Sequence, residues 1–154
     1  MASNGANGHA RRIFPAPTVK VYVACSFGRR DLARQVAEVL TGEGFLVTSR
    51  WHSVEAEHWN KDPKIAADHD LTDLDAADGL LSLTEGPEAG YQTGGRHVEF
   101  GYAIARMKWL WIVGPLENVF HEGIGRVARF DTLSAWLRHM TGRIPAELPA
   151  AVAR

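Results

Sequence analysis

Hydrophobic residues along this chain fall into two alternating patterns. Short, nearly continuous apolar runs are typical of strands buried on both faces of a sheet. The predicted strands are residues 19–25, 45–51, 79–83, 108–113 and 126–130. Segments with apolar residues every three or four positions are typical of helices. The predicted helices are residues 31–40, 63–77, 95–107 and 132–140. Asp131 is expected to cap the last of them.

Strands that alternate with helices through short turns predict a parallel sheet covered on both faces. We therefore expect a single α/β fold, a doubly wound five-stranded parallel sheet of flavodoxin or Rossmann type. Ligands bind such sheets beyond the carboxyl ends of the strands. Three segments are expected at those ends, residues 26–30, 84–95 and 114–121.

Length and composition indicate one ordinary globular domain. The chain has 154 residues, 45 % of them hydrophobic and 23 % charged. We expect the domain to span residues 18–143, between a disordered tail at 1–17 and a C-terminal tail at 144–154. A net charge of −1 argues against a nucleic-acid polymer as partner. A single cysteine, Cys25, excludes an internal disulfide, and no apolar run is long enough for a membrane span, so we expect a cytoplasmic protein.

The stretch Gly94–Ala103 is the first candidate for chemistry. Two glycines, Gly94 and Gly95, open a predicted helix, and Glu99 follows on its first turns. A helix N-terminus offers free N–H groups and a partial positive charge, which suit an anionic ligand. Glu99 is then either a carboxylate aimed at a substrate or a glutamate stabilised by the helix dipole.

The turn after the first strand is the second candidate, and its residues are Ser26, Phe27, Gly28, Arg29 and Arg30. A serine and two arginines suit a phosphate, and a phenylalanine can stack on a base. A solvated turn is the alternative interpretation. Trp51 and Trp59 flank residues 52–62, a predicted loop or lid, and are candidates for contact with an aromatic ligand.

The remaining polar residues give weaker signals. The seven histidines lack metal-ligand spacing, so we expect neither a metal nor another cofactor. Asp70, Asp73 and Asp75 lie on the predicted helix at 63–77. Asp73 and Asp75 are interpreted as solvated surface charges, and the direction of Asp70 is left open.

Three motifs in this order resemble the nucleoside 2-deoxyribosyltransferase superfamily, which includes 2′-deoxynucleoside 5′-phosphate N-hydrolases and pyrimidine-nucleotide N-glycosidases. They are Tyr22…Ser26-Phe27, Asp70-Leu71…Ala77-Asp78, and Gly94-Gly95…Glu99-Phe100-Gly101-Tyr102-Ala103. The resemblance covers residues 19–113 and continues loosely to His121.

The resemblance implies a retaining N-glycosidic reaction with Glu99 as the nucleophile. Asp70 matches the acid or orienting aspartate, and Tyr22 matches a tyrosine beside the nucleophile and the sugar. The substrate-binding residues that it implies are Ser26, Phe27, Gly28, Arg29, Arg30, Trp51, Gly94, Gly95 and Asn118. It also implies a homodimer or a larger homo-oligomer, in which Asn118 or His121 completes a neighbour's site.

Three functions remain open at this stage. The first is hydrolysis of a nucleoside 5′-monophosphate, which the resemblance implies is a 2′-deoxy one, to free base and sugar phosphate. The second is deoxyribosyl transfer between bases on an unphosphorylated nucleoside. The third is a nucleotide-binding or sensing module without turnover. The turn after the first strand and the segment 85–95 differ from the hydrolase pattern, which leaves the choice between nucleotide and nucleoside open.

Overall fold

The computed structural model describes residues 18–86, 94–143 and 148–149. The expected tails at 1–17 and 144–154 lie outside these residues, apart from 148–149. The strands are β1 (Lys20–Ala24), β2 (Leu46–Val47), β3 (Gly79–Leu83), β4 (Trp109–Val113) and β5 (Val127–Phe130). The α-helices are α1 (Arg30–Gly42), α2 (Pro63–Ala76), α3 (Gly95–Ala105), α4 (Val119–Gly123) and α5 (Leu133–Thr141). Single 3-10 turns occupy Phe27–Arg29, Glu55–Glu57 and Trp59–Lys61.

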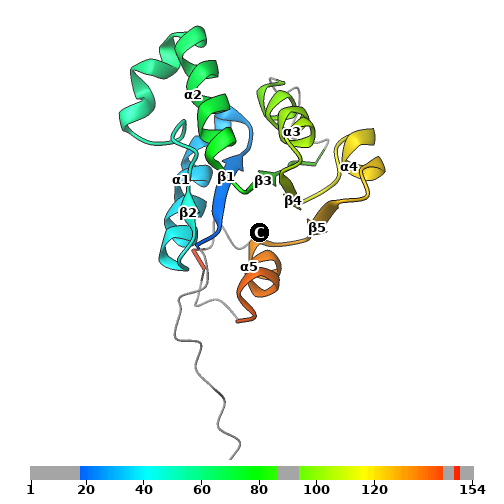
Figure 1. The fold of residues 1–154 in the computed structure, drawn as a ribbon. Coiled ribbons are helices and arrows are strands. Elements are labelled where there is room, and N and C mark those ends of the chain that lie inside the picture. The colour runs from blue at the N-terminus through cyan, green and yellow to red at the C-terminus, as the bar shows by residue number, and fades with distance from the viewer. Residues whose placement is uncertain (1–17, 87–93, 144–147, 150–154) are drawn as a thin grey trace, which may run out of the picture.

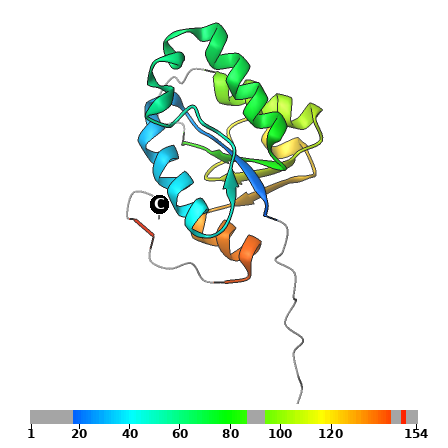
Figure 2. The same ribbon diagram turned by 60° about the vertical axis from the view of Figure 1, so that its left-hand side comes forward.

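The strands form one parallel sheet in the order β2-β1-β3-β4-β5. This order confirms the doubly wound, flavodoxin-like sheet predicted from the sequence. Helices α1 and α5 lie on one face and α2 and α3 on the other (Figures 1 and 2). The carboxyl ends of β1, β3 and β4 therefore meet at the edge where α3 begins. No helix of the described residues is long and apolar enough to cross a bilayer.

The core is built from the continuous apolar strands. All five residues of β3 are buried, as the pattern predicted for a strand covered on both faces. On the α1/α5 face, Trp136 of α5 is fully buried and packs on Trp111 of β4 and on Phe45. Gly79 of β3 allows this packing, because a Cβ there would lie 2.3 Å from the Trp111 ring.

The second strand is much shorter than predicted. The apolar run 45–51 indicated a strand, but β2 contains only Leu46 and Val47. Side chains take over the hydrogen bonds to β1 beyond that point. The Ser49 hydroxyl accepts a hydrogen bond from the Val23 N–H at 3.1 Å, and the Trp51 indole N–H donates to the Val23 carbonyl at 3.0 Å. Trp51 is thus held against β1 as a buried side chain outside the sheet.

One further prediction in the C-terminal half was wrong, and one helix was not predicted. Asp131 does not cap α5; the hydroxyl of Thr132 accepts the hydrogen bond from Ala135 N–H, and Asp131 pairs with Arg129. The segment 114–121 was assigned no helix from the sequence, yet α4 begins at Val119. Its cap is Asn118, whose side-chain oxygen accepts two backbone N–H groups, and asparagine is a preferred N-cap residue.

Candidate active site

Tyr22 and Glu99 meet in the interior although they are far apart in sequence. Tyr22 lies in the middle of β1 and is fully buried. Its hydroxyl donates a hydrogen bond to Glu99 Oε1 at 2.7 Å. Glu99 reaches this position because it lies on the side of α3 that faces the sheet. The buried residues of that side are Arg96, Phe100 and Ala103. The carboxylate is therefore held in one direction by a rigid donor.

Asp70 approaches the same place from α2. Asp73 and Leu74, one turn further along, are buried, so this side of α2 faces the sheet. Burial raises the pKa of Asp70 to about 6, aided by the negative charge of Asp73. Burial also raises the pKa of Glu99 to about 7; the Tyr22 hydrogen bond opposes this rise and the Asp70 charge adds to it. Two carboxyl groups with raised pKa values at one place are typical of acid–base chemistry.

Both acids line a cavity of about 180 Å³. Asp70 and Glu99 line it together with Cys25, Phe27, Trp51, Asn60, Ala66, Gly95 and Arg96. It lies at the carboxyl end of β1, where a doubly wound sheet binds its ligands. Burial raises the pKa of the Cys25 thiol to about 12, so this cysteine stays protonated and is no thiolate nucleophile.

The wall of the cavity opposite α3 carries aromatic side chains. The rings of Phe27 and Trp51 are 6.2 Å apart between centroids and tilted by 33°. Phe27 is largely exposed, whereas Trp51 is buried and anchored to β1. The Asn60 amide donates to the Trp51 carbonyl at 2.7 Å, which fixes the other end of this wall. Aromatic side chains beside half-buried acids suit a planar, heteroaromatic group.

The polar residues of the turn after β1 are occupied by acidic partners. The Ser26 hydroxyl donates to Glu85 Oε1 at 3.0 Å, and Arg29 Nε lies 3.1 Å from the same oxygen. Arg30 pairs with Glu57 at 3.0 Å. Gly28 has open space around it. Of this turn, only Phe27 lines the cavity directly.

The start of α3 is fixed by a buried ion pair. Gly94 precedes the helix, Gly95 is its first residue and lines the cavity, and Arg96 follows. The Arg96 guanidinium donates to both oxygens of Glu117, at 2.9 and 3.2 Å. Their side chains are only 6 % and 9 % exposed. Glu117 also accepts the backbone N–H of Glu85 at 2.9 Å, which joins the ends of β3 and β4 to α3.

Asn118 does not line the described cavity. It caps α4, and its amide nitrogen lies 3.4 Å from His97 Nδ1 on α3. Its expected role in a neighbour's site needs a second copy of the chain and stays a prediction.

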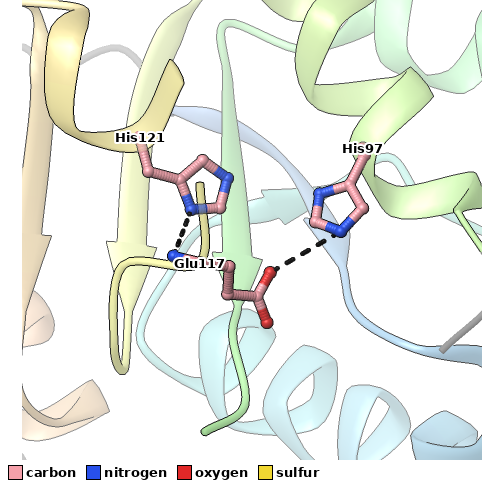
Figure 3. Close-up of side chains that lie close together, drawn as sticks. All are labelled: His97, Glu117 and His121. Atoms are coloured by element: carbon pink, nitrogen blue, oxygen red, sulfur yellow. Dashed lines mark hydrogen bonds and ion pairs between the residues drawn. The ribbon is translucent and has the colours of Figure 1, made fainter. Parts of the chain in front are cut away.

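One group of side chains has the composition of a metal site. Candidate ligand atoms of His97, Glu117 and His121 lie within 4.8 Å of one another (Figure 3). However, the Glu117 backbone N–H donates to His121 Nδ1, and burial lowers the pKa of His121, so the ring is neutral and its proton sits on Nε2. Glu117 is already paired with Arg96. Nδ1 of His121 and the Glu117 carboxylate are thus already engaged by donors, which disfavours a cation, while Nε2 of His121 has no hydrogen-bond partner among the described residues.

Sequence patterns missed several of these residues. Asn60, Arg96, Glu85 and Glu117 were not singled out as site residues from the sequence, because their roles depend on contacts between distant segments. Asp73 was wrongly interpreted as a solvated charge: it is buried and holds Arg50 at 2.7 Å. The signal available for Asp73 was its spacing, three residues from Asp70 and therefore on the same side of a helix.

A larger cavity of about 650 Å³ lies elsewhere on the molecule. It is lined by residues at the amino ends of the strands, including Val19, Asp78 and Trp109, on the opposite side of the sheet from the Tyr22–Glu99 hydrogen bond. Because ligands of parallel sheets bind at the carboxyl ends, the smaller cavity is the better candidate for the active site.

Comparison with known proteins identifies the fold. The sequence matches no protein-family model and no curated protein. Among solved structures, the CMP N-glycosidase BcmB of Clostridium botulinum matches with a TM-score of 0.54 and 14 % identity, over 79 % of this chain and 97 % of that one. The solution structure of BlsM matches with a TM-score of 0.54 and 17 % identity, over 90 % and 91 %. The chain therefore shares the α/β fold of these two proteins, one of which is a nucleotide N-glycosidase.

Proposed function

We propose that the protein cleaves the N-glycosidic bond of a nucleoside or nucleoside 5′-monophosphate through a glycosyl-enzyme intermediate. The observation that carries this proposal is the hydrogen bond of 2.7 Å between Tyr22 and Glu99, in a cavity that Asp70 also lines. The sequence resemblance, and the fold shared with a CMP N-glycosidase, support the same reaction. In the sequence, two arginines in the turn after β1 favour the monophosphate, and base exchange on a nucleoside begins with the same step.

In the first half of the reaction, Glu99 is the nucleophile. Its carboxylate attacks C1′ of the sugar, the C1′–N bond breaks, and the bonding electron pair leaves with the base. Asp70, in its protonated form, gives its proton to that nitrogen. The product on the protein is an ester between Glu99 and C1′. A carboxylate opposite an oxocarbenium-like centre, with a separate proton donor, is the arrangement of retaining glycosidases.

In the second half, the ester is resolved. Water attacks C1′, Asp70 accepts the water proton, and Glu99 is released as a carboxylate. A second base in place of water gives a new nucleoside by the same geometry. Tyr22 holds Glu99 in position throughout, and Phe27 and Trp51 provide the aromatic wall for the base.

The test is a panel of ribo- and deoxyribonucleosides and their 5′-monophosphates, each with and without a foreign acceptor base. Products are separated by chromatography. Free base without acceptor indicates hydrolysis, and a new nucleoside indicates transfer. Binding without any product indicates a sensing module and contradicts the proposal.

The same panel is run on matched variants. Glu99→Gln and Asp70→Asn are expected to lose at least about a hundredfold in kcat, because each removes a reacting group. Asp75→Asn changes the same charge further along α2, where Asp75 pairs with Arg106 at the surface, and should leave activity unchanged. Peptide mass spectrometry of quenched reactions should find the sugar on Glu99; a glycosylated residue elsewhere would refute the assignment.

A further inference from the structure

The arginines at the candidate site are all matched by carboxylates. Arg29 lies 3.1 Å from Glu85, and Arg30 lies 3.0 Å from Glu57. Arg96 is the one cationic side chain among the described residues that line the cavity, and both oxygens of Glu117 accept from it. Each guanidinium charge is therefore cancelled within hydrogen-bonding distance.

The other ionisable side chains that line the cavity are acidic. They are Asp70 and Glu99, one of which is negatively charged in the reactive form, and the described lining residues include no second cation. The start of α3 contributes only about half a positive charge. A phosphate dianion would thus enter a site whose nearby charges sum to a negative value, and this is unfavourable at short range.

From this charge balance we infer that the site takes an unphosphorylated nucleoside in preference to its 5′-monophosphate. The inference rests on the proposed function and narrows its substrate class. It reverses the order of preference that two arginines in the turn after β1 had indicated from the sequence. Ser26, the other expected phosphate ligand, already donates its hydroxyl proton to Glu85.

One guanidinium nitrogen of the cavity is left for a neutral ligand. Nη1 of Arg96, which lines the cavity, is buried and has no hydrogen-bond partner among the described residues. An arginine held by a carboxylate can still donate to a sugar hydroxyl or a base carbonyl, because such an acceptor needs no net positive charge. Glu117 positions Arg96 for this contact and sets the charge of the pair to zero.

The first experiment uses the wild-type protein. Values of kcat/KM are measured by base release for each nucleoside and its own 5′-monophosphate at one pH and ionic strength. We expect the nucleoside to be favoured by about tenfold or more. Equal values, or a higher value for the monophosphate, would overturn the inference while leaving the proposed reaction intact.

The second experiment changes the charge balance. Glu117→Gln leaves the Arg96 charge uncancelled, so the ratio of kcat/KM should move toward the monophosphate by about tenfold. Glu85→Gln leaves the Arg29 charge uncancelled in the same way, and it replaces Glu117→Gln in the experiment if that variant does not fold. Glu43→Gln is the matched control, since Glu43 pairs with Arg143 just after the end of α1, away from the cavity. An unchanged ratio in the folded charge variants contradicts the inference.

A third measurement separates the two proposals. If the wild-type protein cleaves no substrate, the proposed function fails, and binding is then measured by calorimetry. Tighter binding of the nucleoside than of its monophosphate still supports the charge argument. Tighter binding of the monophosphate refutes it.

Discussion

Replacement of Tyr22 by phenylalanine removes one hydroxyl and leaves the ring in the core. That hydroxyl donates to Glu99 at 2.7 Å, and a hydrogen bond from Tyr22 also lowers the pKa of Asp70. The pKa of Glu99 is about 7 and that of Asp70 about 6, so the two share one proton between these pH values. The proposed reaction requires this proton on Asp70 and the charge on Glu99.

The size of the effect follows from the strength of that hydrogen bond. A hydrogen bond to a charged group contributes about 1.5–3 kcal/mol, which is about one to two units in the pKa of Glu99. Without it, Glu99 binds the shared proton more tightly. The reactive form, with Glu99 ionised and Asp70 protonated, becomes about 10- to 100-fold rarer. We expect kcat/KM of Tyr22→Phe to fall by that factor.

Two measurements check this expectation. The pH profile of kcat/KM should be bell-shaped in the wild type, with limbs near pH 6 and 7, and its alkaline limb should move up by about one to two units in Tyr22→Phe. Carbon NMR titration of the Glu99 carboxyl reports the same shift without substrate. Tyr102→Phe is the matched control, because its hydroxyl donates to the exposed Asp75. A folded Tyr22→Phe protein with the wild-type rate and profile would refute the reasoning.

Three further predictions concern stability, each measured by urea denaturation. The pKa of Glu99 is raised from 4.5 to about 7 in the folded protein, so ionisation of Glu99 lowers the free energy of unfolding as the pH rises through this interval. The free energy of unfolding of Glu99→Gln should therefore exceed that of the wild type by up to about 3 kcal/mol at pH 8 and match it at pH 4. A difference that does not depend on pH would contradict this. Arg96→Met leaves the Glu117 carboxylate buried and unpaired and should cost about 3–5 kcal/mol, most of which Arg96→Met/Glu117→Leu should restore; additive losses would argue against a coupled pair. Gly79→Ala places a Cβ 2.3 Å from an atom of the Trp111 indole ring and should lower the free energy of unfolding by about 1–3 kcal/mol. Gly28→Ala, whose Cβ would have nothing within 4 Å, should leave it nearly unchanged. Equal losses in the two variants would mean that the core relaxes freely around the new Cβ.

The sequence was sufficient for the architecture because burial imposes a repeating pattern. Strands covered on both faces must be apolar throughout, as in β3 and β4, and helices on a sheet must repeat their apolar positions every three or four residues. Both patterns are local, so they can be recognised in the sequence without knowing which segments pack against each other. The prediction of a strand at 45–51 was wrong at the positions where the side chains of Ser49 and Trp51 make the hydrogen bonds to β1 in place of the backbone. No local sequence pattern indicates such a replacement.

What the sequence by itself determined is therefore the parallel sheet, its carboxyl edge as the ligand edge, and Glu99 as a candidate nucleophile. The resemblance implied a tyrosine beside the nucleophile, and the tertiary structure supplied the contact itself, a hydrogen bond between Tyr22 and Glu99 across 77 positions of sequence. It also decided the charges of the site, since Arg29 and Arg96 appear as free cations in sequence but meet Glu85 and Glu117 in space. The physical reason is that electrostatic energy depends on distance and burial, which are set by the packing of segments that are remote in the chain.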